Sequence, residues 1–118
     1  MRNTNSDFIL TLIQKTNQNE VKWEIVKHTI DLPHDEKITS KIYVTTINDK
    51  KFRVYEYQYK HYIDEDEWLW NQRKRIEMID DDNEKLYEFD YDYSVSDLFD
   101  SVTRQTSGID DFLKDFLA

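Results

Sequence analysis

Cysteine is absent from this chain of 118 residues, which excludes disulfide bonds and thiolate chemistry. Glycine and proline occur once each, so the chain has no glycine-rich loop for phosphates and no flexible linker. Long apolar runs are missing as well, because the run over residues 8–13 is too short for a signal peptide or a membrane span. We therefore expect residues 1–118 to form a single soluble domain in the cytoplasm.

The apolar content is sufficient for a folded domain. Ile, Leu, Val and Phe together supply 31 of the 118 residues, which is above the level at which a charged chain stays disordered. Charged residues make up 35% of the chain, so a strongly solvated surface should enclose a core of modest size.

Negative charge is concentrated in the second half of the chain. Residues 1–62 carry 10 Lys and Arg against 8 Asp and Glu, a net charge of +2, whereas residues 63–118 carry 6 against 17, a net charge of −11. The two halves sum to the −9 of the whole chain. Such asymmetry indicates an oriented field and a preferred binding face, although a need for solubility alone would also explain it.

Helix periodicity gives way to strand periodicity near residue 21. Asn5 or Ser6 can cap a first helix, whose apolar residues recur at spacings of three and four and which should fade near residue 17. Residues rich in β-formers then predict strands over 21–30, 41–47, 52–62 and 86–91. The segment around Pro33 is expected to be a turn, because proline has no N–H for a strand ladder.

Residues 68–79 permit two interpretations. As a strand, they place Trp68, Trp70 and Ile76 on one face and Arg73 and Arg75 on the other. As a helix, their apolar positions scatter less cleanly around the axis. We favour a long strand and keep the helix as the alternative.

Two helices are expected near the C-terminus. Ser94 or Ser96 can cap the first, which carries its apolar residues over 98–102, and Gly108 suits its C-terminal end. Residues 109–116 form a second, shorter amphipathic pattern. The predicted fold class is α+β, with an N-terminal helix, an antiparallel meander of about five strands, and one or two C-terminal helices packed on the sheet.

The stretch from residue 76 to residue 102 combines acidic residues with aromatic ones. It is predicted to form a strand, an acidic turn, a second strand and the start of a helix, with Tyr87, Phe89 and Val102 facing the core. We expect this stretch mainly to support the fold, and its carboxylates form a candidate binding surface.

Metal sites and catalysis are not indicated by the spacing of polar residues. The acidic run 80–84 lacks the glycine of a calcium loop at the sixth position and has Tyr91 where that loop has its glutamate. The histidines His28, His34 and His61 show no metal-ligand spacing. We expect no catalytic residue, no metal and no cofactor, and Asp/Glu-x-Lys triplets leave a metal-dependent enzyme as a remote alternative.

Direct binding of nucleic acid is not expected, because a chain with a net charge of −9 must overcome its own repulsion of phosphates. Cations interleaved with tyrosines on a predicted strand nevertheless form a candidate patch for stacking bases. Tyrosines at period two are equally typical of a half-buried sheet face. The patch comprises Lys50, Lys51, Arg53, Lys60, Arg73, Lys74 and Arg75 with Tyr55, Tyr57 and Tyr59.

A protein partner with a basic surface fits the acidic and aromatic second half best. Tyrosine suits interfaces because one end of its side chain is apolar and the other is polar. If the groove of that partner normally holds nucleic acid, the chain would act as a nucleic-acid mimic; a solvated rim is the alternative for any one carboxylate. The candidate partner-binding residues are Asp64, Glu65, Asp66, Glu67, Asp80, Asp81, Asp82, Glu88, Asp90, Tyr91, Asp92 and Tyr93. Residues 109–117 are a candidate surface for homo-oligomers, as in a structural module.

The C-terminal part of the chain resembles small uncharacterised α+β proteins of bacteria, phages and mobile elements. The resemblance covers about the last forty residues and is carried by the sequence of residues 91–94, the helix pattern over 98–102 and residues 107–113. It implies a non-enzymatic protein that binds a partner, either an inhibitor of host defence or an antidote to a toxin. It assigns no catalytic residue.

Overall fold

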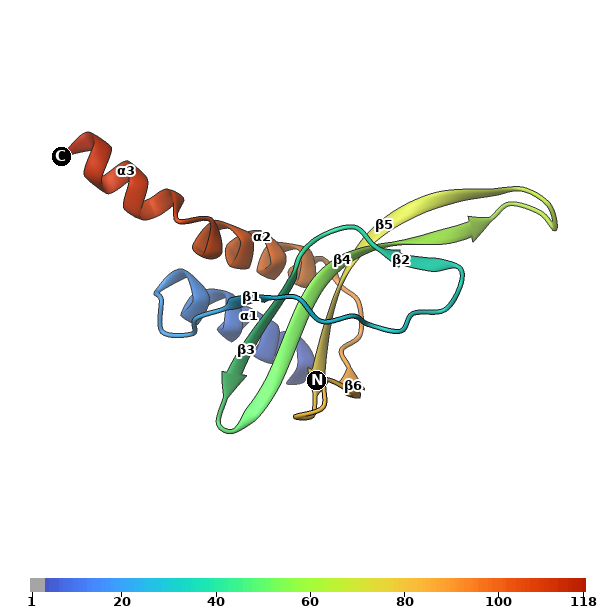
Figure 1. Ribbon diagram of the computed structural model, residues 1–118, viewed down its shortest axis with the longest axis horizontal. Helices are drawn as coiled ribbons and strands as arrows, with labels where there is room; N and C mark the ends of the chain where they lie inside the picture. Colours follow the sequence, from blue (N-terminus) through green and yellow to red (C-terminus); the bar gives the residue numbers. More distant parts are fainter. Residues whose placement is uncertain (1–3) are drawn as a thin grey trace.

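The computed structural model describes residues 4–118 and shows an α+β fold (Figure 1). Its described part holds an N-terminal helix, a six-stranded antiparallel sheet and two C-terminal helices, which confirms the predicted fold class. Along the chain, α1 spans Thr4–Asn17, β1 Glu24–Val26, β2 Glu36–Ile38, β3 Ile42–Ile47, β4 Lys50–Tyr62, β5 Trp68–Ile79, β6 Lys85–Glu88, α2 Tyr93–Ser107 and α3 Ile109–Leu117. Within these residues, no helix is long and apolar enough to cross a membrane.

The sheet is a meander with one added strand. Strands β1, β3, β4, β5 and β6 are neighbours in that order, and every pairing is antiparallel. β3 pairs with residues 50–54 of β4, and β2 pairs with residues 57–59 along the same edge of this long strand. β5 is the strand that its period-two pattern predicts, which excludes the helical alternative for residues 68–79.

Helices α1 and α2 cover one face of the sheet and enclose the main core (Figure 1). Val54 and Ile76 come from facing positions of β4 and β5, and both are fully buried. Leu98 and Val102 of α2 pack on them at the spacing that an amphipathic helix requires. Ile9 of α1 completes this core cluster, which also includes Val102 as predicted.

Several local predictions differ from the structure. The expected strand over residues 21–30 is reduced to β1, and β2 begins at Glu36, the last residue of the turn expected over 32–36, and includes residues 37 and 38, for which no strand was predicted. Asp92, rather than Ser94 or Ser96, caps α2. Tyr87, expected in the core, is 44% exposed, because its ring packs edge-on against Phe89 while its hydroxyl accepts a hydrogen bond from Asn5.

Strands β4 and β5 continue far beyond the body of the molecule. Residues 58–72, which we call the arm, form a two-stranded ribbon whose base alone is joined by β2 (Figure 1). With the arm at one end and α3 at the other, the molecule has a long axis of 57 Å against 34 Å in the two other directions. Helix α3 projects at the opposite end, where it follows α2 after Gly108.

Candidate functional site

The predicted acidic residues lie in three separate places. Residues 64–67 form the tip of the arm, whereas residues 80–82 lie in the turn between β5 and β6. These two runs flank the 12 residues of β5, so roughly 36 Å of strand separates them. Residues 88–93 lead from the end of β6 into α2 beside the second half of β5, where the Phe89 N–H donates to the Ile76 carbonyl. The structure therefore does not bring the candidates together into one acidic surface.

Two of these carboxylates hold the turns in which they lie. Asp64 Oδ1 accepts hydrogen bonds from the N–H groups of Asp66 and Glu67 at 2.9 and 3.1 Å. Asp80 Oδ1 accepts from the N–H groups of Asp82 and Glu84, both at 2.9 Å. Such contacts replace a strand ladder where the chain reverses, which gives both aspartates a role in the fold itself.

Asp92 is a structural residue as well. Its carboxylate accepts from the Ser94 N–H at 2.7 Å, from the Ser94 hydroxyl, and from the Ser6 hydroxyl at 3.1 Å. The bonds from Ser94 lower the pKa of Asp92 below its ordinary value, with a smaller contribution from Ser6. The carboxylate thus caps α2 and ties it to α1.

Tyr91 and Tyr93 lie at the same junction, on the surface. Arg73 is positioned between two tyrosine rings, 4.7 Å from the centroid of Tyr91 and 5.1 Å from that of Tyr59. Tyr93 is 84% exposed, and its ring lies tilted against that of Tyr91, with the centroids 6.4 Å apart. Tyr91 therefore anchors the junction on the side of β5, while Tyr93 remains available for contacts.

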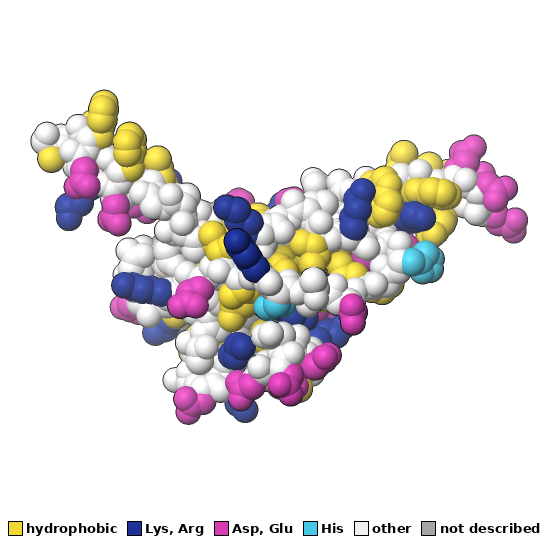
Figure 2. All heavy atoms as spheres, in the orientation of Figure 1, with side chains coloured by type: hydrophobic (Ala, Val, Ile, Leu, Met, Phe, Trp, Pro, Cys, Tyr) yellow, Lys and Arg dark blue, Asp and Glu magenta, His cyan; other side chains and the backbone are white. Residues whose placement is uncertain are grey.

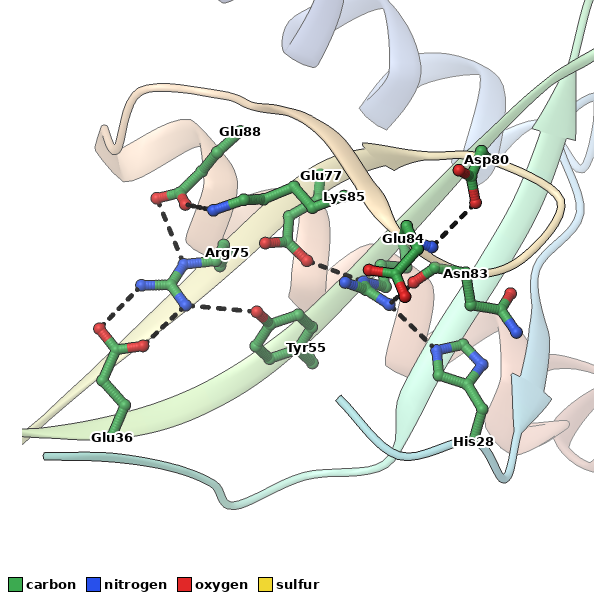
Figure 3. Close-up of polar contacts among 11 residues, drawn as sticks. His28, Glu36, Tyr55, Arg75, Glu77, Asp80, Asn83, Glu84, Lys85 and Glu88 are labelled. Atoms are coloured by element: carbon green, nitrogen blue, oxygen red, sulfur yellow. Dashed lines mark hydrogen bonds and ion pairs between the residues drawn. The ribbon is translucent and has the colours of Figure 1, made fainter. Parts of the chain in front are cut away.

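Glu88 belongs to a network around Arg75 (Figure 3). Arg75 donates to both carboxylate oxygens of Glu36, at 3.0 and 3.1 Å, and to the hydroxyl of Tyr55 at 3.3 Å. Its Nε lies 3.3 Å from Glu88 Oε2 without the geometry of a hydrogen bond, so this contact is an ion pair only. Burial would lower the pKa of Arg75, but the bonds to Glu36 and Tyr55 outweigh burial and raise it.

A second buried network surrounds Arg53, on the same face of the sheet. Arg53 Nε donates to Glu77 Oε1 at 2.7 Å, and both side chains are 3% exposed. Arg53 Nη1 contacts the Asn83 carbonyl at 3.0 Å and His28 Nε2 at 3.2 Å. Because a guanidinium only donates, Nε2 accepts and the neutral imidazole carries its proton on Nδ1. Burial, with Arg53 and Lys51 nearby, lowers the pKa of His28.

These networks neutralise much of the basic patch that sequence reasoning considered for nucleic acid. Arg53 and Arg75 are paired with carboxylates, and Lys74 lies 3.6 Å from Glu56. Tyr55 and Tyr57 are buried, and their rings contact the Arg75 guanidinium instead of solvent. The hollow of about 710 Å³ beside both networks is lined in part by these paired side chains, Arg53 with Glu77 and Arg75 with Glu36.

The arm carries a surface that the candidate residues did not include, since the pattern over 68–79 was considered for its secondary structure and not as a binding surface. Its large apolar side chains are between 40% and 61% exposed. They are Tyr62, Ile63, Trp68, Leu69 and Trp70. The adjacency of two tryptophans to four carboxylates was the sequence signal for this surface.

Cations hold the arm tryptophans in place. Tyr62 lies opposite Trp68, and Lys60 lies opposite Trp70. Lys60 Nζ is 4.2 Å from the ring centroid of Trp68, and Lys37 Nζ of β2 is 4.5 Å from that of Trp70. Figure 2 shows apolar and cationic side chains together on the arm, with acidic side chains at its tip. We call the residues Lys37, Lys60, Tyr62, Trp68 and Trp70, which share one face of the ribbon, the aromatic face.

Helix α3 presents the other exposed apolar surface. None of its residues is buried, and Phe112 and Phe116 stack with ring centroids 5.8 Å apart. Arg104 of α2 donates to Asp110 at 2.7 Å, which fixes the start of α3 against the end of α2. The amphipathic pattern predicted for residues 109–116 is thus confirmed as a helix with its apolar face in solvent (Figure 2).

Comparisons with known proteins found no matching family model, no matching curated protein and no matching solved structure. Within residues 4–118, no group of three or more His, Asp or Glu side chains is arranged to hold a metal ion.

Proposed function

We propose that this chain is a non-enzymatic protein that binds another protein and inhibits it, with the arm as its principal contact. One observation carries the proposal: five large apolar side chains stand 40–61% exposed on a ribbon that projects from the body. Contiguous exposed apolar residues are uncommon on monomeric proteins and typically mark interaction sites. Tryptophan is the residue most enriched among those that dominate binding energy.

The charges of the arm indicate the chemistry of its partner. Residues 64–67 place four carboxylates at the tip, directly beside the aromatic face. A basic surface would be steered toward this tip, and Trp68 and Trp70 would then supply the apolar contact. The cation–π contacts from Lys60 and Lys37 restrain both rings before binding, which reduces the entropy lost on association.

Inhibition would follow from occupation of a basic groove. An arm with an acidic tip in such a groove excludes the anionic ligand that the groove normally holds. If that ligand is a nucleic acid, the chain acts as a nucleic-acid mimic. The chain would then suit a phage or a mobile element that disarms a host defence protein. An antidote that covers a toxin uses the same contact and is the alternative within this proposal.

Paired tryptophan substitutions test the proposal. The Trp68→Ala/Trp70→Ala variant should lose most of the protein captured from a bacterial lysate by the wild-type chain, with affinity falling at least about 30-fold. Leu10→Ala is the matched control, because Leu10 is 57% exposed on α1 but lies outside the arm. Quantitative mass spectrometry of the captured proteins reads the result. Equal capture by all three chains would contradict the arm as the contact.

A second candidate function is a structural module that self-associates through α3. The exposed apolar face of α3, with no buried residue, favours it. A chain truncated after Gly108 should then lose its oligomeric state, and an intact oligomer would argue against this function.

A further inference from the structure

We propose that two copies of this chain pair along the free edge of β5 in the arm, antiparallel, with Trp70 opposite Trp70 of the partner subunit. The pairing itself does not depend on the proposed function. Only the statement below on how the paired chains bind another protein rests on that function. The occupant of the edge is inferred from the order of charges along β5.

The edge of β5 is open along the arm. Among the described residues, β5 pairs with β6 only from Glu77 to Ile79, so residues 68–72 have a strand on one side alone. An edge of this kind presents unpaired N–H and C=O groups to solvent and serves as a template for a further strand. Segment 89–92 and Tyr91, which contacts Arg73, mark where the open edge ends.

The hydrogen bonds show which residues face that edge. In an antiparallel pair, alternate residues direct both backbone groups toward the neighbouring strand and those between them direct both groups away. The Ile63 N–H donates to the Glu67 carbonyl, so the odd-numbered residues of β5 face β4. The Ile76 carbonyl accepts from Phe89 on the other side, in agreement with this alternation. Trp68, Trp70 and Gln72 therefore offer their backbone groups to a new strand.

Charge along this strand is self-complementary. Residues 64–67 are all acidic, residues 68–72 are uncharged, and residues 73–75 are all basic. A two-fold axis through Trp70 places Glu67, directly before β5, opposite Arg73 of the partner subunit. Opposite charges directly across two antiparallel strands stabilise the pairing, and like charges there destabilise it. A second copy thus matches the edge at both ends.

The same register also suits the backbone. Trp70 pairs with Trp70 of the partner subunit, and Trp68 with Gln72 of the partner subunit, in the positions that exchange both hydrogen bonds, giving about six bonds in all. Glu67 and Arg73 of the partner subunit fall in a position without those bonds, where side chains approach most closely, with about 4.5 Å between Cα atoms. Because the strands run antiparallel, the two bodies lie at opposite ends of the paired arms.

Pairing would join the two aromatic faces into one. Trp68 and Trp70 of each copy lie on the same side of the ribbon, so the pair presents four tryptophans side by side. A protein bound to this combined surface would contact both copies, which makes the partner subunit part of the binding site. Self-association and capture of another protein are nevertheless measured separately, because the first needs only the purified chain.

Exchange of the two charges tests the pairing. In sedimentation equilibrium at about 100 μM, a concentration suited to a small interface, the wild-type chain should have twice its mass of 14.5 kDa. Glu67→Arg and Arg73→Glu should each be monomeric, because each places like charges opposite each other. An equimolar mixture of the two variants should recover the double mass, as should the chain that carries both substitutions. A monomeric wild type, or a mixture that stays monomeric, would overturn the proposal.

A backbone variant separates edge pairing from side-chain effects. Gln72→Pro removes an N–H that points away from β4, so the variant keeps its own ladder but should not dimerise. Circular dichroism checks that its fold is retained, and a folded, dimeric Gln72→Pro chain would refute the pairing. The chain truncated after Gly108 should remain dimeric, since loss of the dimer there would assign self-association to α3. None of these measurements uses a captured protein, so failure of the dimer leaves the capture test unaffected.

Discussion

At the scale of single residues, the ion pair of Arg53 and Glu77 is the feature with the largest expected effect on stability. Both side chains are 3% exposed, and removal of one member leaves a charge buried without its counterpart. Glu77→Gln should therefore lower the free energy of unfolding by about 3 kcal/mol in urea titrations. Lys15→Ala removes an exposed pair with Glu20 and should cost under about 1 kcal/mol. Equal losses in the two variants would contradict burial of the Arg53 pair.

His28 should make stability depend on pH. The folded protein lowers the pKa of His28 below 6.5 through burial and through Arg53 and Lys51. The unfolded chain therefore takes up a proton first as the pH falls, and acidification from about pH 7.5 to about pH 5.5 should reduce the free energy of unfolding. In His28→Gln, which keeps an acceptor for Arg53, the reduction should be smaller. Urea midpoints at several pH values check this, and identical slopes for both chains would contradict it.

The burial of Arg53 and Arg75 in the two networks could not be predicted from the sequence. Arg53 and Arg75 were grouped with the exposed cations, because a strand pattern predicts which residues share a face and not whether that face is covered. Arg53 is buried because the register of β4 and β5 places it opposite Glu77, 24 positions away in the sequence. Asp92 was similarly grouped with binding residues, although an aspartate just before a helix is also a capping signal.

At the scale of elements, α3 should contribute little to the stability of the fold. It has no buried residue, and the element on which it mainly packs is α2. Truncation after Gly108 should therefore change the free energy of unfolding by less than about 1 kcal/mol, because little apolar surface returns to water. Thermal and urea unfolding of the truncated chain check this expectation. A loss of more than about 2 kcal/mol would show that α3 packs on the body.

The strands with strong alternation were the predictable ones. β3, β4 and β5 follow from β-formers and a period of two, and the meander follows from their short connections. β2 could not be predicted, because Glu36, Lys37 and Ile38 lack an apolar pattern. They form a strand only because β4 extends past its pairing with β3 and leaves its edge free for them. The projection of the arm was also beyond prediction, since it depends on where the helices stop covering the sheet.

At the scale of the whole molecule, the acidic charge is divided between distant places. The sequence correctly suggests an asymmetric charge, but residues 64–67 and 80–82 lie at opposite ends of β5. The candidate carboxylates therefore should not act alike. Neutralising residues 64–67 to the corresponding amides should weaken capture of a partner protein and reduce its dependence on salt. Neutralising residues 81 and 82 should leave capture unchanged, and the reverse ranking in pull-downs at low and high salt would contradict the role of the arm.

Residue-resolved amide exchange along β5 tests most directly whether the arm makes the intermolecular contacts of this protein. In dilute solution the amides of Trp68, Trp70 and Gln72, which face away from β4, should exchange fast, while Leu69 and Asn71 between them stay protected. Raising the chain concentration from about 5 μM to about 500 μM should slow exchange at the three outward amides and leave α3 unchanged. Exchange along β5 that is independent of concentration, or protection that appears in α3 instead, would contradict the arm as the contact.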